Sequence, residues 1–118
     1  MAAIGFNETQ KAAIVSLLIE MINIDGSVDT SECAVFNTIC VELCISDDIF
    51  RIGQSLDSMV AINIMKNMSD IQKIATAKYL IRAIDADAND DDKEIQLFNV
   101  ICNATGVDVL INAKDTDF

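Results

Sequence analysis

The chain matches itself when one copy of the sequence is displaced by 62 positions. Over residues 10–40, 13 of the 31 positions are identical to those of residues 72–102. The identical pairs include Gln10 and Gln72, Leu18 and Leu80, Phe36 and Phe98, and Cys40 and Cys102. Self-similarity at one fixed offset indicates that a single supersecondary unit occurs twice. We therefore predict two internal repeats, near residues 7–46 and 69–108.

Apolar residues in each repeat recur three and four positions apart, which is typical of amphipathic helices. In the first repeat they are Ile14, Leu17, Leu18, Met21 and Ile22, followed by Phe36, Ile39, Cys40 and Leu43. In the second they are Ile74, Ala77, Leu80, Ile81 and Ile84, followed by Leu97, Phe98, Ile101 and Cys102. The chain has no proline, so long helical segments are uninterrupted. Each repeat is predicted to be a helix, an acidic turn and a second helix.

The segment between the repeats carries its own helix-start signals. Ser46 is a candidate N-cap for a helix to about Gln54, and Asp57 or Ser58 begins another through Lys66. Ser69 caps the first helix of the second repeat. We count six helices, with a seventh short one near 107–113, and expect a loose tail over 114–118. No stretch alternates as a strand does, and no Gly/Ser/Pro linker divides the chain.

The predicted fold is therefore all-α, with six to seven helices and two repeated helical hairpins related by a pseudo-twofold axis. The chain of 118 residues is expected to form a single domain, 1–118, because it falls within the usual size of one domain.

The turn inside each repeat is acidic, and ten residues, 85–94, contain six carboxylates. The equivalent acids are Asp25, Asp29 and Glu32 in the first repeat, and Asp87, Asp91 and Glu94 in the second. One interpretation is a capping box, in which Asp caps the second helix and Glu three residues later reaches back to the N-cap amide. The other is a site for Ca²⁺, Mg²⁺ or Mn²⁺, since hard cations take carboxylate oxygens as ligands. Capping leaves Asp25 and Asp87 unexplained, because they follow helix C-termini, where the dipole disfavours negative charge. Both interpretations stay open.

The charge of the chain excludes several classes of function. It has 19 acidic and 8 basic residues, a net charge of -11, and no histidine. Such a chain is a poor partner for nucleic acid and suits cations or basic protein surfaces. Without histidine, a nucleophile–base pair or a glycine-rich phosphate loop, it is predicted not to be an enzyme. A mean hydropathy of +0.35 suggests the alternative function, an interaction module without a metal site, with a protein partner or a homodimer.

The cysteines and the apolar segments suggest a cytoplasmic protein. No apolar stretch approaches the roughly 20 residues of a membrane-spanning helix, and the N-terminal segment does not resemble a signal peptide. Cys33, Cys40 and Cys44 follow one helical stripe, and Cys102 lies elsewhere. Without a CxxC pair, the four are expected to be reduced, small apolar core residues, with at least Cys40 and Cys102 buried.

Residues 24–32 (IDGSVDTSE), 86–94 (ADANDDDKE) and 68–73 (MSDIQK) together resemble the TerB (tellurite-resistance) domain family. The second turn departs from that pattern at Ala88 and Asp90, where the family has glycine and a hydrophobic residue. The resemblance covers nearly the whole chain. It implies an all-helical, non-catalytic cytoplasmic domain whose six repeated acids bind metal ions. It also implies a role in tellurite or stress resistance, in some members with protein partners at the inner membrane surface.

Overall fold

Six helices make up most of the computed structural model, which describes residues 5–24, 30–85 and 92–110, apart from the side chain of Asp92. They are α1 (Glu8–Asn23), α2 (Thr30–Glu42), α3 (Asp47–Ser55), α4 (Ser58–Lys66), α5 (Asp70–Asp85) and α6 (Asp92–Thr105). A further helical turn covers 107–110, and no strand occurs within the described ranges. The predicted all-α fold with six to seven helices is therefore confirmed. None of these helices combines the length and apolar character that a membrane crossing needs.

Local capping fixes where four of the helices begin. The side chains of Ser46 and Asp57 accept hydrogen bonds from the backbone amides of Ile49 and Met59, at the starts of α3 and α4. Ser69 accepts one from the amide of Gln72 at the start of α5. These three predicted caps are confirmed, and Asn7 caps α1 in the same way. Each cap provides an acceptor for an amide that has no partner within its helix.

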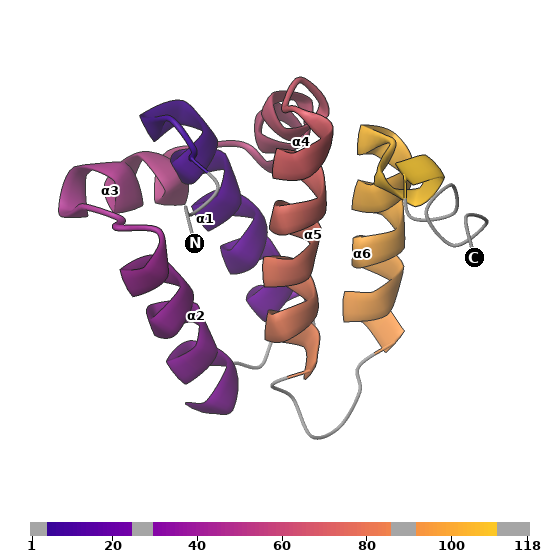
Figure 1. Cartoon of the computed structure of the whole chain (residues 1–118). Coiled ribbons are helices and arrows are strands. Elements are labelled where there is room, and N and C mark those ends of the chain that lie inside the picture. Colours follow the sequence, from indigo (N-terminus) through magenta and orange to yellow (C-terminus); the bar gives the residue numbers. More distant parts are fainter. Residues whose placement is uncertain (1–4, 25–29, 86–91, 111–118) are drawn as a thin grey trace.

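Helix α1 lies at the centre of the fold and contacts each of the other five helices. Its predicted apolar face is confirmed, since all five of its residues are buried. In Figure 1, α5 stands between α2 and α6, and it contacts both. The core joins these helices through large buried side chains: Leu17, Met21, Ile39, Met65, Leu80 and Ile101.

Helices α1 and α3 approach very closely at Gly53. A methyl group added there would lie 2.5 Å from Cγ1 of Val15 and 2.9 Å from the carbonyl oxygen of Ala12. The hydroxyl of Ser16 donates a hydrogen bond of 3.0 Å to the carbonyl of Leu56, just beyond the end of α3. Only glycine therefore fits the crossing of these two helices.

The first turns of α1 and α5 meet through a pair of glutamines. The amide nitrogen of Gln72 donates to Oε1 of Gln10 at 3.1 Å and to the carbonyl oxygen of Gly5 at 2.8 Å. Gln10 and Gln72 occupy equivalent positions in the two sequence repeats. The pseudo-twofold relation of the repeats stays a prediction.

The expectation that the four cysteines are buried core residues is confirmed for Cys102 and is wrong for the other three. Cys102 is buried and Cys40 is half-buried, whereas Cys33 and Cys44 are exposed. Cys44 has a positive φ of 55°, and the amide of Ile45 donates to the carbonyl of Cys40. This is the left-handed termination of a helix, so Cys44 leaves the helical stripe that the spacing suggested. Ile81, another expected core residue, is exposed on α5.

Candidate functional site

Two of the six predicted metal ligands, Glu32 and Glu94, belong to the described structure. Glu32 is the third residue of α2, and Glu94 is the third residue of α6. The other four, Asp25, Asp29, Asp87 and Asp91, lie outside the described residues. The prediction for those four positions stays a prediction.

Glu32 and Glu94 are almost completely buried, with exposed fractions of 1% and 0%. Both carboxylate oxygens of Glu94 and Oε2 of Glu32 are shielded from solvent. Glutamate is among the residues that are least often fully buried. Full burial of glutamate at two repeat-equivalent positions is therefore unusual.

Figure 1 shows the last turn of α1 and the first turn of α2 at the same end of the molecule as the last turn of α5 and the first turn of α6. Within the described structure, α2 and α6 do not contact one another, although each contacts α1 and α5. Glu32 and Glu94 are therefore carried on separate helices with α5 between them. The described residues hold no group of three or more Asp, Glu, Cys or His that could bind a metal ion.

The same fold shows what ordinary capping boxes look like. In α1, Asn7 and Gln10 exchange hydrogen bonds of 3.0 and 2.7 Å, and in α5, Ser69 and Gln72 do so at 3.0 and 3.2 Å. Both glutamines are the third residue of their helix, as Glu32 is of α2, and both are only half-buried. A capping box in this protein therefore requires neither a carboxylate nor full burial.

An ion pair links the C-terminal residue of α2 to the last turn of α5. The guanidinium of Arg82 donates two hydrogen bonds to the carboxylate of Glu42, at 3.0 and 2.7 Å. This pair lowers the pKa of Glu42, because the bonded guanidinium favours the charged carboxylate. Arg82 also lies over the ring of Tyr79, 5.8 Å from its centroid.

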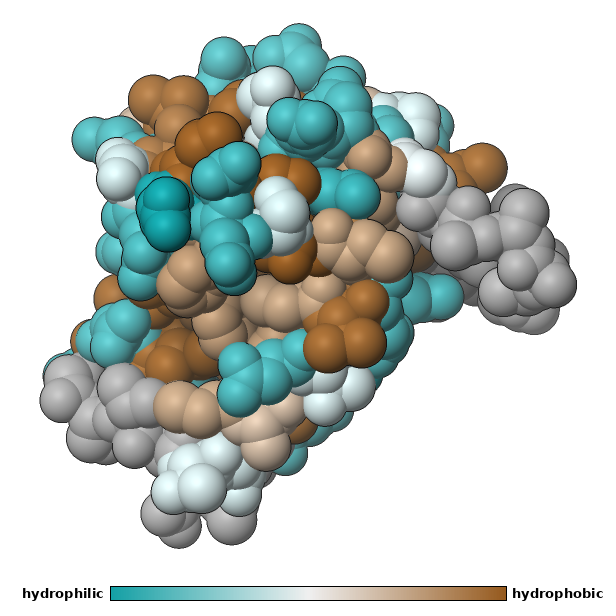
Figure 2. All heavy atoms as spheres, turned by 90° about the vertical axis from the view of Figure 1, so that its left-hand side faces the viewer, coloured by the Kyte–Doolittle hydropathy of each residue, from teal (hydrophilic) through white to brown (hydrophobic). Residues whose placement is uncertain are grey.

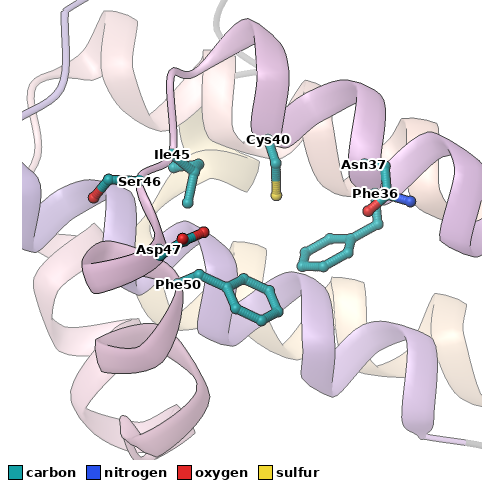
Figure 3. A pocket seen from close by; sticks show the side chains of 7 residues that line it. All are labelled: Phe36, Asn37, Cys40, Ile45, Ser46, Asp47 and Phe50. Atoms are coloured by element: carbon teal, nitrogen blue, oxygen red, sulfur yellow. The ribbon is translucent and has the colours of Figure 1, made fainter.

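A groove between α2 and α3 was not predicted from the sequence. The rings of Phe36 and Phe50 face one another across it, with centroids 5.9 Å apart and planes tilted by 49° (Figure 3). The cavity there has a volume of about 240 Å³. Its lining is mixed, with Cys40 and Ile45 beside the two rings and with the polar residues Asn37, Ser46 and Asp47. The sequence pattern had placed Phe36 and Cys40 in the core. The two phenylalanines on either side of the α2–α3 connection are the sequence feature from which this groove could have been predicted.

No family model matches the chain, and no curated protein matches it. A solved structure does: the protein of unknown function PG1108 from Porphyromonas gingivalis W83, which is 23% identical. The match covers 97% of this chain and 99% of that one, with a TM-score of 0.74. At this level of identity the likeness supports the fold alone.

Proposed function

We propose that this chain is a non-catalytic domain that binds divalent cations of the Ca²⁺, Mg²⁺ or Mn²⁺ type at its acidic turns. The observation that carries the proposal is the burial of Glu32 and Glu94 at equivalent positions in the two sequence repeats. Each buried carboxylate directly follows one of the two acidic turns.

The choice of glutamate at these two positions supports this proposal. The capping boxes of α1 and α5 use neutral Gln10 and Gln72 at the same helix position. A neutral side chain is thus sufficient for capping, and a negative charge at Glu32 and Glu94 has a further use if it holds a cation.

We further propose one cation site in each turn, because α2 and α6 do not contact one another in the described structure. Glu32 would act with Asp25 and Asp29, and Glu94 with Asp87 and Asp91. Carboxylate oxygens are the preferred ligands of hard cations, and the net charge of -11 attracts cations to the chain. The resemblance to the TerB family adds the proposed context, which is tellurite or stress resistance.

The test is thermal unfolding of the wild type and of the double variant Glu32→Gln/Glu94→Gln, each in chelator and in millimolar Ca²⁺, Mg²⁺ or Mn²⁺. An ion that binds only the folded state adds about 2.7 kcal/mol per site at 100 times its dissociation constant. The wild type should gain this stability, and the double variant should lose the gain. In chelator the two should differ by less than about 1 kcal/mol, because Gln also completes a capping box. Each single variant should keep about half of the gain.

The matched control is Asp47→Asn/Asp48→Asn, which removes two exposed carboxylates from the first turn of α3. It changes the net charge by the same amount and should keep the full ion-dependent gain. The proposal is wrong if the wild type shows no gain beyond that in matched monovalent salt. It is also wrong at these two residues if the Glu32→Gln/Glu94→Gln variant keeps the full gain.

Protein–protein interaction is the second candidate function, and exposed large apolar side chains favour it. They are spread over the described helices and include Val41, Ile52, Met59, Ile71 and Val100. A titration of the divalent cations followed by calorimetry separates the two candidates, because an interaction module without a metal site gives no binding heat.

A further inference from the structure

Helix α2 is apolar in composition but has little cover. Seven of its thirteen residues are apolar, yet only Glu32 and Ile39 are buried. Val41 is 78% exposed. A helix that is hydrophobic on all sides is normally enclosed by protein. One face of α2 is therefore exposed, although the composition of this helix is typical of one that packs against protein on that side.

That face borders the groove between α2 and α3. Figure 2 shows it as a band of apolar side chains that crosses this side of the molecule between hydrophilic residues. In the described structure the backbones of α2 and α3 do not pack on one another, and the side chains of Phe36 and Phe50 bridge the space. In Figure 3 the sulfur of Cys40 also points into the groove. Burial raises the pKa of this thiol, which agrees with its apolar surroundings.

The charge around the groove is negative. Asp47 lines one end of the cavity, and the lining contains no Lys or Arg. Asp48 follows it on α3 and is also exposed, with Arg51 at 3.9 Å. Over the whole chain the net charge is -11, so a second copy of this chain would be repelled and a basic partner attracted. The combination of an apolar floor, an acidic end and a negative molecule is complementary to a cationic amphipathic helix.

We propose that the α2–α3 groove is a docking site for a basic amphipathic helix of a partner protein. The apolar face of that helix packs a large side chain against the paired rings of Phe36 and Phe50. A Lys or Arg next to this anchor lies against Asp47. This is the helix-in-groove mode of recognition, with a central apolar anchor and a charged rim.

The probe is a synthetic peptide of about 18 residues, five helical turns, with Leu on one face and Lys on the other. A second peptide carries Glu at every Lys position, and a third has the first composition in scrambled order. Binding is measured by fluorescence anisotropy at physiological ionic strength, because low salt exaggerates surface electrostatics. The Leu/Lys peptide should bind at least tenfold more tightly than either control peptide. Equal binding of the three peptides would overturn the proposal.

Two matched pairs of variants locate the binding. Phe36→Ala removes an aromatic wall of the groove, and Phe98→Ala removes the half-buried phenylalanine at the repeat-equivalent position on α6. Asp47→Lys reverses a charge in the groove, and Asp70→Lys reverses one at the first residue of α5, also directly after a capping serine. The two groove variants should weaken binding of the Leu/Lys peptide tenfold or more, and the controls should stay within about twofold. Equal losses in groove and control variants would overturn the assignment.

A measurement on the wild type tests the groove even if Phe36→Ala does not fold. Bound peptide should slow the reaction of Cys40 with a thiol reagent at least fivefold and leave exposed Cys33, on the same helix, unchanged. Sedimentation of the protein without peptide tests whether a second copy of this chain occupies the groove. A dimer that disappears in Asp47→Lys would show that a second copy fills the groove, and the proposed partner would be wrong.

Discussion

Replacing Gly53 by alanine should destabilise the protein, although alanine is the better helix former. Within a helix the change from Gly to Ala is worth about 1 kcal/mol in favour of alanine. Here the new methyl group would lie 2.5 and 2.6 Å from two carbons of Val15, well inside the optimal carbon–carbon separation of about 3.5–4.0 Å. The third contact, 2.9 Å to the backbone oxygen of Ala12, cannot be relieved by a side-chain rotation. Helix α3 must therefore move away from α1.

The magnitude follows from these opposing effects. Overpacking of this kind costs about 3 kcal/mol, the upper part of its usual range, because backbone must shift. Subtracting the helix-propensity gain leaves a net loss of about 2 kcal/mol. For 118 residues the unfolding entropy is about 0.25 kcal/mol/K, so Tm should fall by about 8 °C. Thermal unfolding by circular dichroism and calorimetry measures both quantities.

The other two described glycines allow the steric effect of a new methyl group to be measured separately from backbone strain. A methyl group at Gly5 or Gly106 would meet nothing within 4 Å, but Gly106 has a φ of +85°. Gly106→Ala should therefore lose about 1–2 kcal/mol through backbone strain alone, and Gly5→Ala should be nearly neutral. Shortening the opposing side chain in Gly53→Ala/Val15→Ala should not restore full stability, because the Ala12 oxygen is still too close. If Gly53→Ala matches or exceeds the wild type in Tm, the close crossing of α1 and α3 is refuted.

Thiol chemistry and pH offer two further tests. Exposed Cys33 and Cys44 should react first with a thiol reagent in native buffer. Cys102 should react only as the protein unfolds, because it is buried and burial raises its pKa to about 11. Early labelling of Cys102 would contradict the packing of α6. The lowered pKa of Glu42 stabilises the fold above its unfolded value near 4.5, and this contribution is lost as pH falls through the folded pKa. Glu42→Gln should therefore lower Tm slightly near pH 7 and leave it unchanged near pH 2, while an equal deficit at both pH values would show that the Arg82 ion pair is not responsible.

The features that the sequence predicted well depend on local interactions. Ser46, Asp57 and Ser69 act on amides within three residues, so each helix start could be located without knowing the fold. The apolar face of α1 was also predictable, because its apolar residues gather in one helical pattern.

The features that the sequence did not predict depend on packing between helices. Apolar residues surround α2 on all sides, so the pattern alone does not choose which face meets α1 and α5. The exposed Cys33 and the groove at Phe36 follow from that choice. The full burial of Glu32 could not be inferred either, because glutamate is exposed by default and only the position of neighbouring helices encloses it. The turn acids Asp25, Asp29, Asp87 and Asp91 stay predictions.

The central place of α1 has a consequence for how the protein is made. Its nine buried residues leave the ribosome before the five helices that cover them. Synthesis proceeds at about 5–20 residues per second, so the interval between the end of α1 and the end of α6 lasts about 4–16 s. Early in this interval, before α3 and α4 have been made, the most deeply buried helix of the fold is exposed to any other apolar surface in the cell. The nascent chain should therefore depend on chaperones early, and it should gain protease resistance late, once α6 has been added.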